Sequence, residues 1–244
     1  MTESTGDKIT VVIPTYNERE NLPELARQLL ALPLPGLSLL VVDDNSPDGT
    51  GEIADKLAAD SPDRVAVLHR TAKDGLGRAY IAGMTAALGA GADIVVQMDA
   101  DLSHPASVIP QMVDKLQTTG AGVVIGSRYV PGGSTASDWP LRRKALSVFA
   151  NVYVNAILQL KVKDATAGFK AWRAATLRAI DLPTIRSNGY SFQVEMNYRT
   201  VKKGLRILEV PIVFEERAEG ASKMTLGVQL ESAVTPWKLL FGRM

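Results

Sequence analysis

The stretch Ile94–Pro105, IVVQMDADLSHP, determines how the rest of the chain is interpreted. Its first part, Ile94–Met98, has the apolar character of a buried strand, and two carboxylates, Asp99 and Asp101, follow directly. Two like charges after a buried strand repel each other unless a cation or hydrogen-bond donors compensate them. The stretch therefore predicts a strand whose carboxyl end holds a positively charged partner.

Short apolar runs and segments of helical length alternate through the first half of the chain. The runs predicted to be strands are Ile9–Ile13, Leu37–Val42, Val65–Leu68, Ile94–Met98 and Val123–Ile125. The segments predicted to be helices are Glu18–Leu32, Thr50–Asp60, Leu76–Ala90 and Ala106–Thr119. This alternation indicates βαβ units, and hence an α/β fold with a mostly parallel central sheet flanked by helices. Ligands of such sheets bind beyond the carboxyl ends of the strands, so the polar residues there are the candidates.

The second half of the chain is less regular. Its Gly, Pro and Ser content predicts a loop at Tyr129–Asp138, and a long helix follows at Leu141–Leu160. Loop-plus-strand elements are predicted at Asp164–Arg173 and Arg206–Glu215, with a helix at Ser191–Lys203 between them. The chain shows no internal repeat, low-complexity tract or linker, so one domain is the simplest interpretation.

Composition limits the function classes. The 244 residues carry 27 Lys and Arg against 26 Asp and Glu, a net charge of +1, which gives no general attraction to nucleic acid. With no cysteine, disulfides and thiolate chemistry are excluded. The first residues, MTESTGDK, lack the apolar core of a signal peptide, and no apolar run has the length of about 18 residues that spans a bilayer. We therefore expect a cytoplasmic protein.

Three predicted strands run into acidic residues. These residues are Glu18 after the first strand, Asp43 and Asp44 at the end of the second, and Asp99 and Asp101 after the fourth. If the strands are parallel, these side chains share one edge of the sheet. Hard oxygen ligands of this kind suit Mg²⁺ or Mn²⁺, which proteins bind through one or two carboxylates together with substrate phosphates. The sequence therefore predicts that a divalent cation carrying a diphosphate is the partner of Asp99 and Asp101.

Simpler interpretations exist for several of these residues. Asp101 or Ser103 could cap a helix beginning near Pro105. The tripeptide Gly75–Gly77 lacks a full nucleotide-binding pattern and more simply eases a helix start. His104, beside the two carboxylates, is interpreted as structural.

Basic residues come from the second half of the chain. They are Arg128 after a predicted strand, Arg142, Arg143 and Lys144 at the start of the long helix, and Arg217 and Lys223 around AEGASK. Scattered Arg residues are usually solvated, but Arg is also the preferred fork for phosphate oxygens. These residues are therefore candidates for a second anionic ligand.

Seven motifs occur in the order seen in family-2 glycosyltransferases. They are VVIPTYNERENL, VVDDNSPDGT, MDADLSHP, GSRY, DATAGFKAWR, GYSFQVEM and VPIVFEERAEGASKM. More narrowly, the chain resembles polyprenol-phosphate mannosyltransferases, the dolichol-phosphate mannose synthase group, from about Ile9 to Thr225. The resemblance implies a single Rossmann-like nucleotide-sugar glycosyltransferase domain of the A type. It would occupy residues 1–225, and an amphipathic, interfacial segment would occupy residues 226–244.

The resemblance also implies roles for individual residues. The guanosine of GDP-mannose would be held by Pro14, Tyr16, Glu18, Val42 and Asp44. The diphosphate and a Mg²⁺ or Mn²⁺ ion would be bound by Asp99, Ala100 and Asp101, with Ser103 standing where some relatives have Gln as a further metal ligand. Donor phosphates or the incoming lipid phosphate would be neutralised by Arg128, Arg217 and Lys223, and the latter also by Arg143. The implied catalytic residues are Asp101, Arg128 and Arg143.

The chemistry of the implied reaction agrees with these residue types. A polyprenyl (dolichyl-type) monophosphate is already anionic near neutral pH, so it needs positioning and a stabilised leaving group rather than a general base. By resemblance the transfer inverts the sugar and gives a β-linked mannosyl phosphate. The lipid acceptor implies peripheral contact with the cytoplasmic face of a membrane, with Trp237 and Phe241 as apolar anchors and a separate membrane protein as a further partner. Pro236 is expected to break or kink that segment.

Three alternatives remain open on the sequence alone. A polyprenyl-phosphate glucosyltransferase using UDP-glucose would share the motifs. The stretch DADLS, Asp99–Ser103, also fits the D-x-D-x-[ST] nucleophile motif of aspartyl-phosphate phosphatases, although three predicted strands precede it. A non-catalytic nucleotide-sugar binding module is the third.

Overall fold

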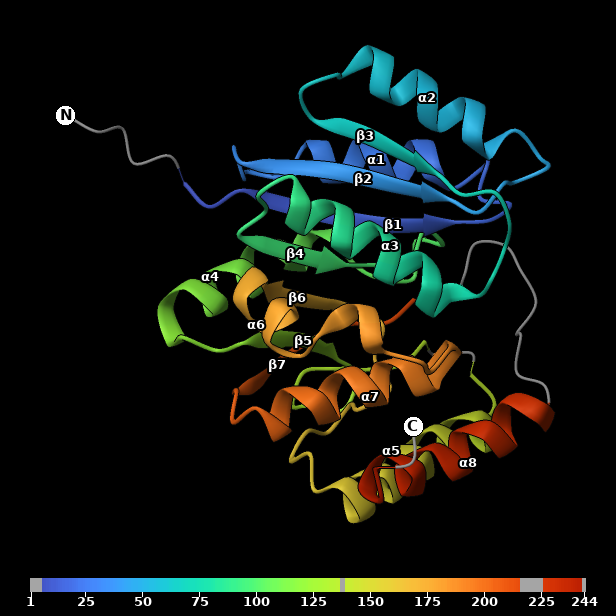
Figure 1. Cartoon of the computed structure of the whole chain (residues 1–244), viewed down its shortest axis with the longest axis vertical. Coiled ribbons are helices and arrows are strands. Elements are labelled where there is room, and N and C mark those ends of the chain that lie inside the picture. Colours follow the sequence, from blue (N-terminus) through green and yellow to red (C-terminus); the bar gives the residue numbers. More distant parts are fainter. Residues whose placement is uncertain (1–5, 137–138, 216–225, 243–244) are drawn as a thin grey trace.

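A seven-stranded sheet forms the centre of the computed structural model (Figure 1), which describes residues 6–136, 139–215 and 226–242, with the backbone alone for 226–232. The strands are β1 (Ile9–Thr15), β2 (Leu37–Asp43), β3 (Val65–His69), β4 (Ile94–Gln97), β5 (Val123–Ser127), β6 (Lys170–Arg173) and β7 (Ile207–Pro211). Their order is β3-β2-β1-β4-β6-β5-β7, and only β6 is antiparallel to its neighbours. The predicted α/β fold with a mostly parallel sheet is confirmed.

Helices cover both faces of the sheet, and further helices lie beyond one end of it. They are α1 (Leu22–Leu30), α2 (Thr50–Asp60), α3 (Leu76–Gly89), α4 (Ile109–Thr119, preceded by the 3₁₀ turn η1, Ala106–Val108), α5 (Leu141–Leu158), α6 (Ala174–Ala179), η2 (Leu182–Thr184), α7 (Gly189–Lys202) and α8 (Leu226–Leu240). The first helix begins at Leu22 rather than at Glu18, because residues 18–21 form a separate turn in which the Asn21 N–H donates to the Glu18 carbonyl at 3.1 Å. Glu18 therefore remains in the loop after β1.

The period-two pattern of the strands divides the core between the two faces of the sheet. On β1, Val12 packs into one apolar cluster, and Val11 and Ile13 pack into the other. Helix α3 approaches the first face so closely that a Cβ at Gly83 would lie 2.5 Å from Val12 Cγ1 and 2.7 Å from Val42 Cγ2. Both faces are thus covered, which explains why the strands are almost continuously apolar.

The strand order reverses at β1, which lies between β2 and β4. Because β1, β2 and β4 are parallel, their carboxyl ends meet at one edge of the sheet, which is where ligands bind in this architecture. Non-glycine residues with positive φ lie just beyond each of these ends: Asn17 (60°), Asn45 (57°) and Leu102 (61°). Asn tolerates this conformation, whereas for Leu it costs about 1–2 kcal/mol. Such strain is concentrated at functional sites.

Helices α5 and α8 lie together at the end of the molecule opposite α2 (Figure 1). Helix α8 continues through Pro236 to Leu240, so of the two effects expected of this proline, a break or a kink, the break does not occur. The Tyr153 hydroxyl donates to the carbonyl of Ala233 at 2.7 Å, which links α5 to α8. Within the part of the chain that the structure describes, no helix has the length and apolar character needed to cross a bilayer.

Candidate active site

The two carboxylates after β4 are each held by a neighbouring hydroxyl. The Tyr80 hydroxyl, on α3, donates to Asp99 Oδ1 at 2.6 Å. The Ser103 hydroxyl donates to Asp101 Oδ1 at 2.6 Å, and the Ser103 N–H donates to the same oxygen at 3.2 Å. Asp101 thus caps the turn at Ser103 rather than a helix, since η1 has no side-chain cap. Both carboxylates are fixed in orientation before any ligand binds.

Tyr80 remains a hydrogen-bond donor at any physiological pH. It is completely buried, and burial together with the negative charges of Asp99 and Asp101 raises its pKa well above the usual value of 10. A tyrosine in the middle of a helix resembles an ordinary core residue in the sequence, so its role beside Asp99 was missed.

The donor set fits a hard divalent cation bound partly by its substrate. Among the residues that the structure describes, no group of three acidic or histidine side chains converges as a metal site. Asp99 and Asp101 are two carboxylates, and Mg²⁺ usually takes one or two from a protein when phosphates complete its coordination. Hydroxyl groups that orient such ligands, as those of Tyr80 and Ser103 do here, raise affinity for the metal. Ser103, implied as a third ligand, acts in this structure as a donor to Asp101.

His104 has a structural environment. Its ring is buried, stacks on Phe169 with 5.1 Å between centroids, and accepts a hydrogen bond from the Asp99 N–H through Nδ1 at 3.3 Å. Gly168 passes close to this pair, since a Cβ at Gly168 would lie 3.6 Å from Asp99 Oδ2, 3.7 Å from His104 Cε1 and 3.8 Å from Gln193 Nε2. Gln193 is buried, and its Oε1 has no hydrogen-bond partner within the described ranges.

The implied nucleoside side of the site lies at the ends of β1 and β2. Asp44 is buried and paired with Arg70, and burial raises its pKa although Arg70 acts in the opposite direction. The Lys73 ammonium lies 3.5 Å from the centre of the Tyr16 ring, a cation–π contact. Both basic residues come from the segment after β3. Arg70 comes directly after a strand, which is the position where ligand-binding side chains are expected, but it was not among the residues predicted for the site.

The other residues implied for guanosine are buried in the strands or bonded to neighbouring residues. Pro14 and Val42 are buried within β1 and β2, so they form the floor of this edge. Glu18 accepts a hydrogen bond from Asn21 Nδ2 at 2.9 Å, and its N–H donates to Thr50 Oγ1 at 3.0 Å. Ala100 is buried between the two carboxylates.

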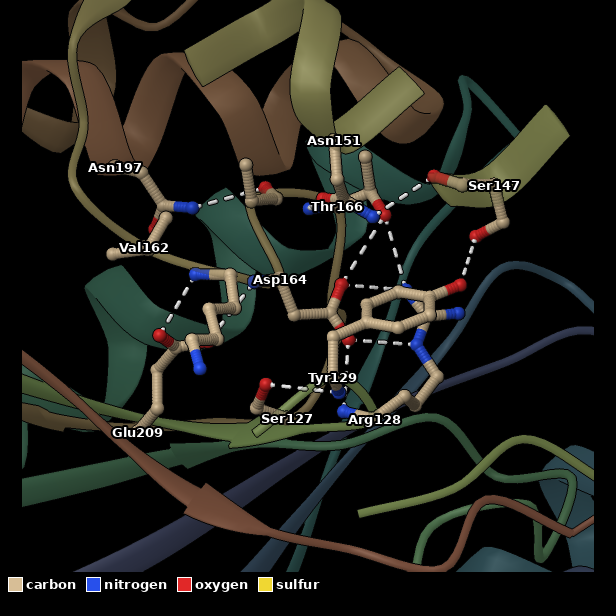
Figure 2. A network of polar contacts seen from close by, with 12 residues as sticks. Ser127, Arg128, Tyr129, Ser147, Asn151, Val162, Asp164, Thr166, Asn197 and Glu209 are labelled. Carbon is tan, nitrogen blue, oxygen red and sulfur yellow. Dashed lines mark hydrogen bonds and ion pairs between the residues drawn. The ribbon is translucent and has the colours of Figure 1, made fainter. Parts of the chain in front are cut away.

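Arg128 is bound by a carboxylate of its own chain (Figure 2). Its Nε and Nη2 donate to Asp164 Oδ2 and Oδ1, each at 2.7 Å, and its backbone N–H donates to Asp164 Oδ2 at 3.0 Å. Burial opposes the charge of Arg128, but the hydrogen bonds and the charge of Asp164 outweigh burial and raise its pKa. The guanidinium expected to bind phosphate is thus engaged in an ion pair, and its partner Asp164 was not predicted from the sequence.

The loop that carries Asp164 is itself held on three sides (Figure 2). Glu209 on β7 accepts the N–H of Asp164 at 2.9 Å, Asn197 on α7 donates to the Ala165 carbonyl at 3.0 Å, and Asn151 on α5 accepts the Thr166 N–H at 3.3 Å. Asn197 is fixed in turn by the buried Lys170, whose Nζ donates to Asn197 Oδ1 at 3.0 Å. The Arg128–Asp164 pair is therefore part of a rigid polar network.

Of the remaining basic residues predicted for the site, Arg143 lies within the described residues. Arg143, in the first turn of α5, lies over the Trp139 ring with 3.8 Å between the guanidinium carbon and the ring centre. Arg217 and Lys223 lie outside the described residues.

Comparisons with known proteins identify the family of the chain. The sequence model described as "Glycosyl transferase family 2" matches residues 10–180. A polyprenol monophosphomannose synthase of Mycolicibacterium smegmatis is 48% identical over 88% of this chain and 80% of its own length. An undecaprenyl-phosphate mannosyltransferase of Micrococcus luteus is 50% identical over 95% of this chain and 94% of its own length. A dolichol-phosphate mannosyltransferase of Pyrococcus furiosus is 40% identical over 89% of this chain and 59% of its own length.

Solved structures share the fold at low sequence identity. The glucosyl-3-phosphoglycerate synthase of Mycobacterium tuberculosis in complex with Mg²⁺ and UDP has a TM-score of 0.72 at 21% identity, covering 97% of this chain and 80% of that chain. The same enzyme with Mn²⁺, UDP and glucosyl-3-phosphoglycerate has a TM-score of 0.69 over 98% of this chain and 80% of that chain.

Proposed function

The chain belongs to glycosyl transferase family 2 and is a glycosyltransferase, and from this premise we propose that it transfers mannose from GDP-mannose to a polyprenyl monophosphate. The product is polyprenyl phosphate β-mannose, formed with inversion at the sugar carbon. The relatives named for mannose transfer to polyprenol, undecaprenyl or dolichol phosphates support the sugar and the acceptor class. Membership of this family sets aside the phosphatase interpretation of Asp99–Ser103.

One observation carries the proposal: a pair of pre-oriented carboxylates at the point where the strand order reverses. Asp99 and Asp101 would hold Mg²⁺ or Mn²⁺, which when bound neutralises charge on the leaving diphosphate. A structural neighbour with Mn²⁺ or Mg²⁺ and UDP supports a divalent cation, without selecting the metal for this chain. Tyr80 and Ser103 keep the two carboxylates in place, so no reorganisation is needed during reaction.

The nucleoside would lie along the ends of β1 and β2. Tyr16 offers a ring face and Asp44 an acceptor, with Lys73 and Arg70 directly beside them. On binding of the nucleoside, Lys73 would either leave the Tyr16 ring or stay beside the ring and pair with the diphosphate. These contacts suit a nucleoside diphosphate, and the choice of guanine over uracil rests on the relatives that use mannose.

The acceptor needs no general base, because its phosphate is already anionic. The two histidines of the chain agree with this requirement, since His104 is stacked in the core and His69 pairs with Asp55 at 2.8 Å. We assign positioning of the lipid phosphate to Arg143, and the resemblance adds Arg217 and Lys223 as further residues that would neutralise phosphate. Arg128 contributes positive charge through a fixed position beside Asp164.

A membrane-bound acceptor requires contact with a lipid surface. In this proposal residues 1–225 form the catalytic domain, and residues 226–244 rest on the cytoplasmic face of the membrane, alone or with a separate membrane-protein partner. Trp237 and Phe241 are 45% and 63% exposed, as an interfacial anchor requires, whereas Leu239 packs inward.

The test is direct synthesis of the glycolipid. The purified protein is mixed with a short polyprenyl phosphate and either GDP-mannose or UDP-glucose, with Mg²⁺, Mn²⁺ or EDTA, and the products are identified by mass spectrometry. Mannosyl product that disappears with EDTA is the expected result. Glucosyl product would retain the mechanism and overturn the donor, and absence of glycolipid with both donors would contradict the proposal.

A further inference from the structure

Gly168 is a glycine that neither the backbone nor the packing requires. Its φ is not one of the positive values that favour glycine. An added Cβ would meet only ordinary van der Waals distances, 3.6 Å to Asp99 Oδ2, 3.7 Å to His104 Cε1 and 3.8 Å to Gln193 Nε2, in contrast to the overlap at Gly83. The missing side chain instead leaves a small space beside Asp99. Glycine is the residue that lets a ligand come this close to the backbone.

The space above Gly168 can be reached from solvent and has polar walls. Gly168 is partly exposed, although His104 and Gln193 beside it are buried. Asp99 Oδ1 accepts from the Tyr80 hydroxyl, and Oδ2 is the oxygen that faces this space. We call the space the Gly168 notch and define it by Gly168, Asp99, His104 and Gln193.

Gln193 brings to the notch an amide group that the rest of the protein does not satisfy. The residue is 3% exposed, and its Oε1 has no hydrogen-bond partner in the part of the chain that the structure describes. Buried polar side chains are nearly always hydrogen-bonded, so an exception calls for an explanation. No site residue was predicted from the motif GYSFQVEM that contains Gln193, nor from the motif DATAGFKAWR that contains Gly168.

The backbone that carries Gln193 is fixed to the same helix as Asp99. The Gln193 carbonyl accepts from the buried Lys170 Nζ at 3.3 Å, and the preceding residue, Phe192, stacks on Tyr80 with 6.0 Å between ring centroids. Tyr80 on α3 also donates to Asp99. The two polar walls of the notch, one on α7 and one after β4, are therefore placed before a ligand arrives, as a selective site requires.

A hydroxyl group is the ligand chemistry that matches both walls. A carboxylate only accepts hydrogen bonds and an amide nitrogen only donates them, whereas a hydroxyl does both at once. It would donate to Asp99 Oδ2 and accept from Gln193 Nε2. Each carboxylate oxygen has two acceptor positions, so Oδ2 can also face a cation. The sugar of a nucleotide donor is joined to the diphosphate that Asp99 and Asp101 would hold, so its hydroxyl groups are within reach.

We propose that the Gly168 notch binds one hydroxyl group of the donor sugar, between Asp99 Oδ2 and Gln193 Nε2, and that Gln193 thereby takes part in the choice of sugar. This rests on the proposed function, since the sugar must be attached to a diphosphate held at Asp99 and Asp101. It adds α7 to the elements that contact the donor.

Binding of GDP-mannose and of GDP to the full chain with Mg²⁺, measured by calorimetry, tests the notch without an acceptor. Gly168→Ala fills the notch with a methyl group, and Gln193→Ala removes the amide. Each should weaken GDP-mannose ~10-fold or more, because a sugar hydroxyl loses its place or its partner, while GDP, which has no sugar, should stay within ~2-fold of the parent. Melting curves should show a folded Gly168→Ala, since its Cβ meets only ordinary distances.

Analogues of GDP-mannose that each lack one sugar hydroxyl identify the group that is bound. One of them should bind the parent chain ~10-fold or more weakly than GDP-mannose, because it leaves the polar walls unpaired. The same analogue should lose little more in Gln193→Ala, since the two changes remove one interaction. It should also be less impaired than GDP-mannose by Gly168→Ala, because it leaves room for the methyl group.

Gln97→Met is the matched control for loss of a buried amide. Gln97 is also buried, but its Oε1 accepts from Trp172 Nε1 at 3.2 Å within the core. This variant should have a lower melting temperature, and its affinity for GDP-mannose relative to GDP should equal that of the parent.

Two outcomes would overturn the proposal. One is binding of GDP-mannose by Gly168→Ala and Gln193→Ala that equals that of the parent, which would leave only water in the notch. The other is an equal weakening of GDP and GDP-mannose, because Gln193 would then be purely structural. Failure of the proposed function is distinct, since the parent chain itself would then not bind GDP-mannose. If the parent binds UDP-glucose instead, the same comparison with UDP decides the notch, and a parent that binds neither donor overturns both proposals.

Discussion

The hydroxyl groups that orient Asp99 and Asp101 come from residues at different sequence separations. Ser103 is two residues from Asp101, so the sequence motif contains its own support. Tyr80 lies nineteen residues before Asp99, on the buried side of α3, and couples the site to the packing of that helix. The DxD motif is thus positioned partly by local turn geometry and partly by the core.

Asp101→Asn should reduce kcat by about 10²–10³-fold, because a neutral amide no longer offsets the cation that stabilises the leaving group. The fold should survive, since the amide oxygen can still accept from the Ser103 hydroxyl and N–H. Steady-state kinetics with GDP-mannose, together with a melting curve, test this. Ser103→Ala is the control for orientation alone and should cost about 10-fold. Normal turnover by Asp101→Asn would contradict the metal assignment.

Arg128→Met should destabilise the fold by about 3–5 kcal/mol, because it leaves the completely buried Asp164 carboxylate without its cation. The double variant Arg128→Met/Asp164→Leu should lose less, since it buries no unpaired charge. Urea unfolding of the two variants measures the difference. A single variant as stable as the parent would show that the pair is not desolvated as the structure indicates.

Lys170 gives a pH-dependent stability with a defined sign. Burial lowers the pKa of this lysine from 10.5 to about 7, with Asp164 opposing the shift. Between pH 7 and 10.5 the unfolded chain therefore binds a proton that the folded chain has released, so the unfolding free energy rises with pH, by up to about 1.4 kcal/mol per unit. The contribution is complete above the unfolded pKa and is lost as the pH falls to 7. Urea titrations at several pH values should show this slope in the parent and not in Lys170→Met.

At the scale of elements, α3 supplies the closest helix–sheet contact and also carries Tyr80. Its approach is possible because Gly83 has no side chain above Val12 and Val42. A glycine within a helix normally costs stability, so its presence here reflects packing rather than propensity.

Gly83→Ala should destabilise the fold by about 1–3 kcal/mol, because its methyl group would overlap Val12 and Val42. The displacement of α3 should also weaken turnover through Tyr80. Gly89→Ala on the same helix is the matched control: nothing lies within 4 Å of its added Cβ, and it should stabilise by about 0.5–1 kcal/mol. Thermal and urea unfolding decide between them, and equal effects of the two substitutions would refute the close approach.

The elements differ in how well the sequence predicts them. Strands β1 to β5 and helix α2 lie where the apolar periodicity places them, because both faces of the sheet are buried. The pairing of β6 was not predictable, since it joins Lys170–Arg173 to a strand far earlier in the chain and runs antiparallel to it. Short α6 was missed because six residues give too little periodicity.

The residues of the site likewise differ in how well the sequence predicts them. The acidic ends of β1, β2 and β4 follow from the rule that ligands bind there, and the structure brings them to one edge. Partners supplied by other elements, such as Tyr80 and Asp164, carry no local signal that distinguishes them from surface or core residues. The roles of Arg143, Arg217 and Lys223 remain predictions.

At the scale of the whole molecule, charge is nearly balanced but unevenly placed. The net charge of +1 gives little attraction to an anionic surface, so any such attraction comes from local groups of basic residues, of which the first turn of α5 is one.

Arg142→Gln/Lys144→Gln should weaken binding to vesicles containing phosphatidylglycerol by about 10–30-fold, because each basic residue near such a surface contributes about 1 kcal/mol. The parent chain should lose a similar amount at high salt, where screening removes the same attraction. Lys202→Gln/Lys203→Gln, at the end of α7, has the same charge change on another helix and should bind as the parent does. Equal weakening by both pairs would show that total charge, rather than its position, governs binding.

The position of β6 between β4 and β5 has a consequence for synthesis of the chain. Strands β1 to β4 can pair as soon as they leave the ribosome, but the partner of the free edge of β4 is made roughly 70 residues later. At translation rates of about 5–20 residues per second, that edge stays open for several seconds. An unpaired edge strand is a template for association between chains. The nascent protein is therefore most prone to aggregate between completion of Gln97 and emergence of Lys170, and slower translation over this interval lengthens the exposure.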